Sequence, residues 1–446
     1  MHQIFIFRRD LRIYDNTTLN HLLQFPDPIL PIFIFDPEQI SSKKNPYFSN
    51  NCVQFMCESL DDLSRQISEK NGKLNFFHDD PIKVLKKITE KHKISRIGIN
   101  QDYTQFSIQR DNDIKNFCKE NNIEFVSLND ITILPIGSIK TLNNTIYKKF
   151  TPFYNKAKIV PIPEPHTNKF NFSSIKLNKK INFHKFYKYN PNILHKGGRT
   201  NAFAQLTHIP LDYKETRNIP SIPTTEMSAF NKFGCISIRE FMQRLKNQKE
   251  ISRQLYFRDF YYNIYFFNKK LFSNTSNPKF LKIKWNKPSK KYLNPFFTGN
   301  TGYPIIDAGI RQLLKTGFMH NRVRMLVASF LTKDLLYNWK IGEKFFAQHL
   351  YDYDPIQNNA GWQTVAGTGE SALEWFRVMN PWTQTEKYDP ECIYIKEWIP
   401  ELNDIPPNDI LKWNEKQIKC SYPKPIVNHE ERRNIMLETF RKALSK

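Results

Sequence analysis

The sequence contains 446 residues, of which 40% are hydrophobic and 24% charged, which excludes an intrinsically disordered chain and leaves room for two domains. Lys and Arg (66) exceed Asp and Glu (43), and the formal charge of +23 favours a polyanionic partner, although a composition rich in Lys, Asn and Ile accounts equally well for part of it. The six cysteines show no metal-ligand spacing, so neither a disulfide framework nor a metal site is expected.

No apolar run has the length of a membrane span, and no secretory signal opens the chain. We therefore expect a soluble monomer without membrane contact. Its expected location is the cytoplasm, in association with the nucleoid, or the nucleus if the source is a eukaryote.

Residues 1–154 alternate short apolar runs with helix-like segments, a pattern typical of a parallel sheet covered by helices on both faces. The predicted strands are QIFIF (3–7), PILPIFIF (28–35), KLNFF (73–77), ISRIGIN (94–100) and EFVSL (124–128). This region is therefore predicted to be a doubly wound α/β domain. It contains no GxGxxG sequence, so a common dinucleotide fingerprint is missing.

Residues 155–195 are rich in Pro, Lys and Asn without periodicity, which indicates a long connector across a surface. Residues 196–446 repeat apolar residues at helical spacing and are predicted to form an all-α domain. The clearest helical segments are residues 233–246, 253–267, 304–319, 322–339 and 343–350. All seven tryptophans lie in this half, which suits a site for a planar ligand or, more commonly, a well-packed core.

Two polar clusters in the helical half are candidates for a site. In HNRVRM, helical spacing places Asn321, Arg324 and Met325 on one face, although a helix start with solvated arginines has the same pattern. The turn TTEMS (224–228) offers hydroxyl and N–H groups to a phosphate, but the same residue types cap helices without any ligand. Neither cluster decides the function alone.

A third cluster, YDYDPIQNNAGWQ (351–363), holds two aspartates, two adjacent asparagines and a tryptophan. Together with motifs along the whole chain, it resembles the photolyase and cryptochrome family of flavoproteins, and most of all the class I cyclobutane pyrimidine dimer photolyases. The similar motifs are FRRDLRIYDN (7–16), NQDYTQFSIQRD (100–111), FTPFY (150–154), GGRTNAFAQL (197–206), TGYPIIDAGIRQLLKTGFMHNRVRM (301–325), NPWTQTEKYD (380–389) and YPKPIV (422–427).

The resemblance implies a helical domain that binds FAD. Asn358 would face the flavin N5 atom, where an amide can donate or accept a hydrogen bond but supplies no titrating proton. Arg324, paired with Asp352, would place positive charge near the ring. The implied cofactor-binding residues are Tyr213, Thr224, Thr225, Glu226, Met227, Ser228, Ile251, Arg258, Arg324, Asp352, Tyr353, Asp354 and Asn358.

The resemblance also implies a deoxyribodipyrimidine photolyase, a lyase that repairs ultraviolet-damaged DNA with blue light. The lesion would flip out of the duplex and receive an electron from excited, reduced FAD. The implied catalytic residues are Gln254, Asn321, Met325 and Asn358, and the implied DNA-binding residues are Arg217, Gln254, Phe257, Asn321, Arg322, Thr364 and Gln384.

Asn321 and Met325 match the enzymes for cyclobutane dimers, because enzymes for 6-4 photoproducts carry two histidines there. Three residues depart from the family pattern: Gln254 replaces a carboxylate, and Phe257 and Thr364 replace stacking tryptophans. The lost ring at Thr364 removes ~1 to 3 kcal/mol of stacking. The alternative functions are therefore a 6-4 photolyase and a cryptochrome-like photoreceptor. Signalling members usually have an extension after the flavin domain, so the chain end soon after YPKPIV favours the enzyme.

In the family, three tryptophans carry electrons from the surface to the flavin. Trp362 and Trp339 match the inner two, whereas the outer position matches Phe296, which is too hard to oxidise. Flavin photoreduction is therefore expected to be slow, or to be rerouted through a tyrosine or Trp285. The antenna chromophore stays open: Ser107 stands where folate-binding members carry an acidic residue, which leaves a deazaflavin, a second flavin or no antenna.

Overall fold

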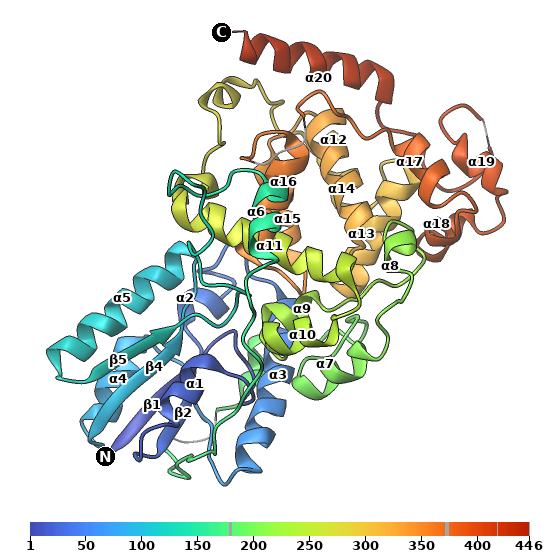
Figure 1. The fold of residues 1–446 in the computed structure, drawn as a ribbon. Coiled ribbons are helices and arrows are strands. Elements are labelled where there is room, and N and C mark those ends of the chain that lie inside the picture. Colours follow the sequence, from blue (N-terminus) through green and yellow to red (C-terminus); the bar gives the residue numbers. More distant parts are fainter. Residues whose placement is uncertain (178–180, 371–373, 417, 446) are drawn as a thin grey trace. The chain divides into compact units, whose positions relative to one another are not determined.

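The computed structural model describes residues 1–177, 181–370, 374–416 and 418–445 (Figure 1). The chain divides into two compact units, each described here by itself. The sheet unit comprises Met1–Asn190, His195–Ile209 and Thr225–Lys269, and the helical unit comprises Pro191–Leu194, Pro210–Thr224 and Lys270–Lys446. This division differs from the expected domain boundaries at residues 154 and 195, because residues 225–269 group with the sheet.

The sheet unit contains a parallel five-stranded sheet with the strand order β3-β2-β1-β4-β5. Its strands are β1 (His2–Phe7), β2 (Ile29–Ile34), β3 (Asn75–Phe77), β4 (Ile94–Asn100) and β5 (Glu124–Leu128). All five predicted strands are confirmed. Their apolar runs are nearly continuous because the sheet is covered on both faces.

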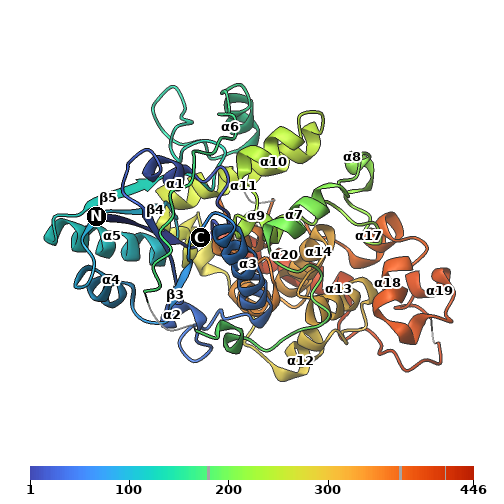
Figure 2. The same ribbon diagram turned by 90° about the horizontal axis from the view of Figure 1, so that it is seen from below.

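Helices cover both faces of this sheet (Figure 2). Ile97 and Ile99 of β4 belong to a buried cluster with side chains of α4 and α5. Gly98, which lies between them, faces the other side, where an added Cβ would be 2.6 Å from the Leu22 side chain of α1. The doubly wound α/β prediction is therefore confirmed. The helices of this unit are α1 (Thr17–Leu22), α2 (Pro37–Ile40), α3 (Asn50–Ser68), α4 (Pro81–Thr89), α5 (Gln105–Glu120), α6 (Phe150–Ala157), η1 (Phe183–Phe186), α7 (Arg199–Leu206), α9 (Ser228–Lys232), α10 (Ile238–Arg244) and α11 (Lys249–Phe267).

The predicted connector follows the sheet edge where it is described. Ser173 donates its backbone N–H to Ile29 O at 2.8 Å, and the Asn75 side chain bonds Ile175 O and Leu177 N. Residues 178–180 lie outside the described ranges. Backbone pairing therefore holds this Pro- and Asn-rich segment without a periodic sequence.

The helical unit has a large apolar core that includes Trp339, Trp362 and Trp413, and a smaller apolar cluster that includes Met436 and Phe440. Its elements are α8 (Tyr213–Thr216), η2 (Lys269–Phe272, which begins at the last residue of the sheet unit), η3 (Pro278–Lys282), α12 (Lys290–Thr298), α13 (Pro304–Thr316), α14 (Asn321–Ser329), η4 (Phe330–Asp334), α15 (Trp339–His349), α16 (Pro355–Ala366), α17 (Pro381–Tyr388), α18 (Ile393–Trp398), η5 (Pro400–Leu402), α19 (Pro407–Leu411) and α20 (His429–Leu444). Gly317 and Gly367 end α13 and α16 in the left-handed conformation that favours glycine.

The helix expected over residues 322–339 is interrupted. The α-helical pattern of α14 ends at Ser329, and η4 continues as a π-helical turn. Inside η4, the buried Lys333 directs its ammonium group to Ala366 O and Trp375 O. Apolar periodicity gives no indication of such a turn, because the turn continues the buried helical pattern of α14. Among the described residues, none of the helices combines the length and hydropathy needed to cross a membrane.

Candidate flavin and lesion site

An ion pair joins α14 to the loop between α15 and α16 of the helical unit. Asp352 Oδ2 accepts from Arg324 Nη2 at 2.8 Å, and Arg324 Nε donates to Met319 O at 2.7 Å. The other carboxylate oxygen, Asp352 Oδ1, is buried and has no hydrogen-bond partner among the described residues. A buried carboxylate oxygen without a donor is costly in free energy, so this atom fits a ligand that brings a donor.

Two residues later, Asp354 begins α16. Its Oδ1 atom accepts from Ile356 N at 3.0 Å and Gln357 N at 3.1 Å, a standard N-cap arrangement. This capping function explains one of the two aspartates in the YDYDP stretch. Tyr353, between the two aspartates, is half-buried.

The adjacent asparagines of α16 have different partners. Asn358 Nδ2 donates to Glu343 O of α15 at 2.9 Å, which leaves its carbonyl oxygen for another partner. Asn359 Nδ2 donates to Phe272 O at 3.3 Å, and its oxygen accepts from Gln363 Nε2 at 2.9 Å. Asn359 thus ties α16 to η2. Sequence analysis missed the Glu343 carbonyl, because a backbone group leaves no residue signal.

Trp362 and Trp339, the expected electron carriers, are both buried. The ring of Trp362 lies 4.9 Å from that of Phe346, edge to face. Trp339 is the first residue of α15, which Asn338 caps through the N–H of Lys340. The helical unit therefore places both indoles in its core.

Phe296, which matches the outer tryptophan of the family, is buried, with 0% of its surface exposed. The expected break in the electron chain at this residue stays a prediction. Trp285 is partly exposed, and the next residue, Asn286, bonds Leu335 O and Leu336 O shortly before Trp339. Trp285 thus meets solvent, and the rerouting of electrons through a tyrosine or Trp285 stays a prediction.

The expected lesion-facing residues of α14 lie together. Asn321 Nδ2 approaches Met325 Sδ at 4.0 Å on the outer face of the helix. Arg322 Nη2 donates to Asn218 Oδ1 at 2.7 Å, and its guanidinium lies 4.7 Å from the ring centroid of Tyr388 in α17. Gln384 precedes Tyr388 by four residues on α17 and is half-buried.

The remaining candidates of the helical unit are half-buried and lie apart in the sequence. The guanidinium of Arg217 is 5.8 Å from the ring centroid of Tyr213, at the start of α8. Thr224 is the first residue of the TTEMS turn, and Thr364 lies on α16 two residues after Trp362. The hydroxyl of Thr364 offers no stacking surface, as expected from the sequence.

The sheet unit carries the rest of the TTEMS turn. Glu226 has a left-handed backbone (φ 50°), and its Oε2 atom pairs with His195 Nε2 at 2.8 Å. Gln205 Nε2 donates to Thr225 O at 3.3 Å. Met227 is buried, and Ser228 is exposed at the start of α9. Side chains from outside the turn therefore support its conformation.

Helix α11 holds the other four candidates of the sheet unit. Ile251 is buried, and Gln254 Nε2 bonds Glu250 O within the helix. The ring centroids of Phe257 and Phe150 lie 4.3 Å apart, so one face of the Phe257 ring is already in an aromatic cluster. Arg258 Nη1 donates to Ile131 O at 2.7 Å. Gln254 and Phe257 share one face by their spacing of three residues.

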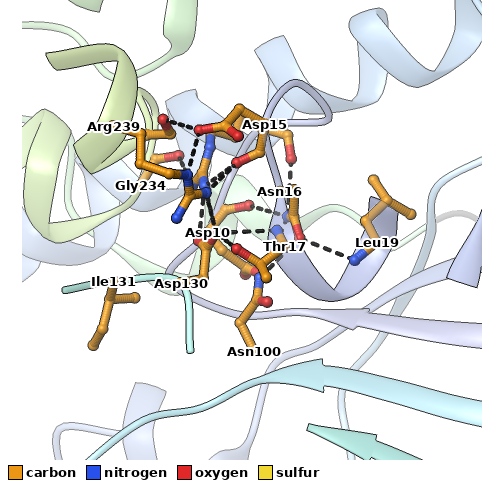
Figure 3. Close-up of polar contacts among 12 residues, drawn as sticks. Asp10, Asp15, Asn16, Thr17, Leu19, Asn100, Asp130, Ile131, Gly234 and Arg239 are labelled. Carbon is orange, nitrogen blue, oxygen red and sulfur yellow. Dashed lines mark hydrogen bonds and ion pairs between the residues drawn. The ribbon is translucent and has the colours of Figure 1, made fainter. Parts of the chain in front are cut away.

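A buried charge network in the sheet unit joins the loop after β1, the loop after β5 and the segment around α10 (Figure 3). Asp130 accepts from Arg12 Nη2 at 2.7 Å and from Arg239 Nη2 at 2.9 Å. Arg12 Nη1 also donates to Gly234 O, and Arg239 Nε donates to Asp15 Oδ2. The network joins the FRRDLRIYDN motif to the segment that follows the TTEMS turn, which explains why residues 225–269 group with the sheet.

Comparisons with known proteins identify the family. A family model of DNA photolyase matches residues 3–166, and a model of the FAD binding domain of DNA photolyase matches residues 251–442. The deoxyribodipyrimidine photo-lyase of Halobacterium salinarum is 32% identical over 99% of this chain and 99% of its own. The chain belongs to the DNA photolyase family.

Solved structures of photolyases and cryptochromes share the fold. An archaeal photolyase from Sulfolobus tokodaii with two FAD molecules is 40% identical, with a TM-score of 0.91 over 99% of this chain and 100% of its own. A Synechocystis cryptochrome is 25% identical, with a TM-score of 0.85 over 98% and 99%. The photolyase fold alone therefore does not separate repair from photoreception.

The photolyase FAD binding domain makes FAD the cofactor, and the residues of the helical unit fit it. Asp352 Oδ1 is a buried acceptor without a donor, and Arg324 supplies positive charge beside it. The orientation of Asn358 leaves an amide oxygen as an acceptor. These residues can bind and orient a flavin ring, and none of them needs to act as an acid catalyst.

Proposed function

We propose that this photolyase-family protein repairs cyclobutane pyrimidine dimers in DNA under blue light. When bound and reduced, FAD supplies the light-driven electron that splits the dimer. The observation that carries the lesion assignment is the contact of Asn321 Nδ2 with Met325 Sδ at 4.0 Å. Neither side chain titrates near neutral pH, so this face offers an amide donor and a thioether rather than an imidazole acid–base pair.

Arg322 and Arg217 support DNA as the partner. Burial, with Arg217 as a further contributor, lowers the pKa of Arg322, although the guanidinium remains charged. Among the described residues, no carboxylate lies within ion-pair distance of Arg322; its partners are the Asn218 amide and the Tyr388 ring. A half-buried arginine with its charge unpaired suits a phosphate contact.

The test uses chemically reduced protein and two oligonucleotides, one with a cyclobutane thymine dimer and one with a 6-4 product. Chromatography after blue illumination measures the restored thymine. We expect restoration of the dimer alone, and Asn321→Ala should lower dimer affinity whereas the exposed control Asn403→Ala should not. Restoration of the 6-4 product alone would refute the lesion assignment. If neither lesion is restored by fully reduced, FAD-loaded protein, the function is photoreception.

We also propose that the sheet unit holds a second FAD as a light-harvesting chromophore. The similar Sulfolobus tokodaii photolyase holds two FAD molecules. Beyond the carboxyl ends of β1 and β4 lie Arg8, Arg9 and Arg110, where the strand order reverses. Burial and the neighbouring Arg8 lower the pKa of Arg110 to about 10, and its Nη2 atom is buried without a partner among the described residues. Arg110 Nε pairs with Asp111 Oδ1 at 3.5 Å, and a pyrophosphate would give the remaining Nη2 donor a partner.

Flavin stoichiometry tests the second site. Released FAD per chain should equal two in the wild type and one in Arg110→Gln, while the exposed control Arg65→Gln should retain two. A wild-type ratio of one, with or without another chromophore identified by mass spectrometry, would refute the second FAD and leave the repair proposal intact.

A further inference from the structure

One glycine of α15 lies directly against the expected inner electron carrier. A Cβ atom added at Gly342 would lie 2.0 Å from Cη2, 2.4 Å from Cζ3 and 2.6 Å from Cζ2 of Trp362. Such approaches are far inside van der Waals contact. The indole cannot simply swing aside, because it is buried and packs edge to face on Phe346. The present ring position therefore requires glycine at residue 342.

The same helical turn touches the other parts of the flavin site. Trp339 begins α15, and Glu343, directly after Gly342, offers the carbonyl that holds the Asn358 amide at 2.9 Å. One turn of α15 thus carries one indole, packs against the second and fixes the residue expected at the flavin N5 atom. Glycine is less favourable than alanine inside a helix, so helix stability does not account for the glycine at residue 342.

We propose that Gly342 is a positioning residue for the light-driven reduction of the flavin, because it allows the ring of Trp362 to rest on the first turn of α15. The inference rests on the proposed roles of Trp362 and Trp339 as electron carriers. Trp362 gives one electron to the excited, oxidised flavin and regains one electron that comes through Trp339. A thiol reductant in solution supplies the net electron.

The matched control lies next to the tryptophan itself. Gly361 precedes Trp362 on α16, and a Cβ atom added there would meet nothing within 4 Å. Gly361→Ala therefore makes the same chemical change in a helix of the same unit without pushing on the ring. Gly342→Ala should slow flavin photoreduction several-fold, measured by absorbance under blue light with dithiothreitol, whereas Gly361→Ala should keep the wild-type rate.

Three further readouts separate positioning from general damage. FAD content and the repair rate of chemically reduced Gly342→Ala protein should stay near those of the wild type, since neither needs electrons from Trp362. The flavin fluorescence lifetime should lengthen, because a displaced indole quenches less. In a Trp362→Phe background, the added Gly342→Ala change should have no further effect on photoreduction, because its target is gone.

Several outcomes would overturn the inference. One is a wild-type photoreduction rate in FAD-loaded Gly342→Ala; another is an equal slowing in the Trp362→Phe background. If Gly342→Ala alone does not fold, the smaller ring of Trp362→Phe should restore folding, and failure of that rescue also refutes the contact. Loss of repair in the wild type would contradict the proposed function but not this inference, because photoreduction requires no lesion.

Discussion

Two regions of the molecule bury charge in opposite ways. In the sheet unit, Asp130 is fully buried between Arg12 and Arg239. In the helical unit, the buried Lys333 has no carboxylate partner within the part of the chain that the structure describes. Its ammonium donates to Ala366 O at 2.8 Å and Trp375 O at 3.0 Å, and lies 4.2 Å from the centroid of the Phe440 ring. One site pairs full charges, and the other holds a single charge with backbone dipoles and a ring.

The difference appears in how each group titrates. Burial alone would raise the pKa of Asp130, but Arg12 and Arg239 outweigh it and hold that pKa well below its usual range. Burial lowers the pKa of Lys333 to about 7, with no opposite charge to restore it. The two carbonyl groups and the aromatic ring thus give the buried ammonium group hydrogen-bond and ring contacts. These contacts do not keep its pKa at the ordinary value. The Asp130 network should therefore be insensitive to pH near neutrality, whereas Lys333 should respond.

Breaking the ion pairs around Asp130 should give the largest loss of stability. Arg12→Met leaves the buried Asp130 with one arginine in place of two, and loss of one partner from a buried ion pair costs about 3 to 5 kcal/mol. We expect the urea midpoint of the far-ultraviolet circular dichroism transition to fall accordingly. Lys44→Met, which breaks an exposed pair with Glu38, is the control and should leave the midpoint unchanged. Equal midpoints for the two variants would show that the network is not a stabilising feature.

The Lys333 region should give an effect on stability that depends on pH. Between about pH 7 and 10.5 the unfolded chain binds a proton at this lysine and the folded chain does not, so folded stability should rise with pH in this window and level off below it. The slope is at most about 1.4 kcal/mol per pH unit. Lys333→Met should remove this rise, because the variant has no group at this position that titrates in this window.

The measurement for Lys333 is the urea midpoint at several pH values from 7 to 10. Other charges near η4 are Asp334, His429 and Arg432, and they remain in the variant, so the difference from the wild type isolates the lysine. Lys340→Met removes a lysine that donates to Ser273 O at the surface and should keep the wild-type pH profile. A persistent rise in Lys333→Met would assign the titration to another group.

Local patterns predicted much of this molecule. The five strands follow from continuous apolar runs, and the contact between Asn321 and Met325 follows from helical spacing. Long-range packing could not be predicted. The Asp130 network joins residues more than a hundred positions apart, and therefore the grouping of residues 225–269 with the sheet was not foreseen.

Some backbone and packing features could not be predicted from the sequence either. The π-helical turn at Phe330–Asp334 and the Glu343 carbonyl leave no side-chain signature. The burial of Phe296, which the motif match places at the outer tryptophan position, could not be predicted, because a match carries no measure of exposure. The requirement for Gly342 likewise appears only when the ring of Trp362 is in place.

Arg322 is a third kind of charged site, because its guanidinium is only half-buried. Its replacement should give the smallest of the expected effects, a change in the salt dependence of DNA binding. Its partners are an amide and a ring, whereas Arg311 pairs with Glu401 at 2.7 Å. Arg322→Ala and Arg311→Ala remove the same formal charge, but only Arg322 is expected to contact a phosphate. The dependence of log affinity for damaged DNA on log salt concentration should become shallower by about 1 for Arg322→Ala and stay unchanged for Arg311→Ala. Affinity titrations at several salt concentrations measure this slope. Equal changes in both variants would mean that net charge alone attracts the DNA, and that an unpaired arginine in this molecule does not mark a phosphate contact.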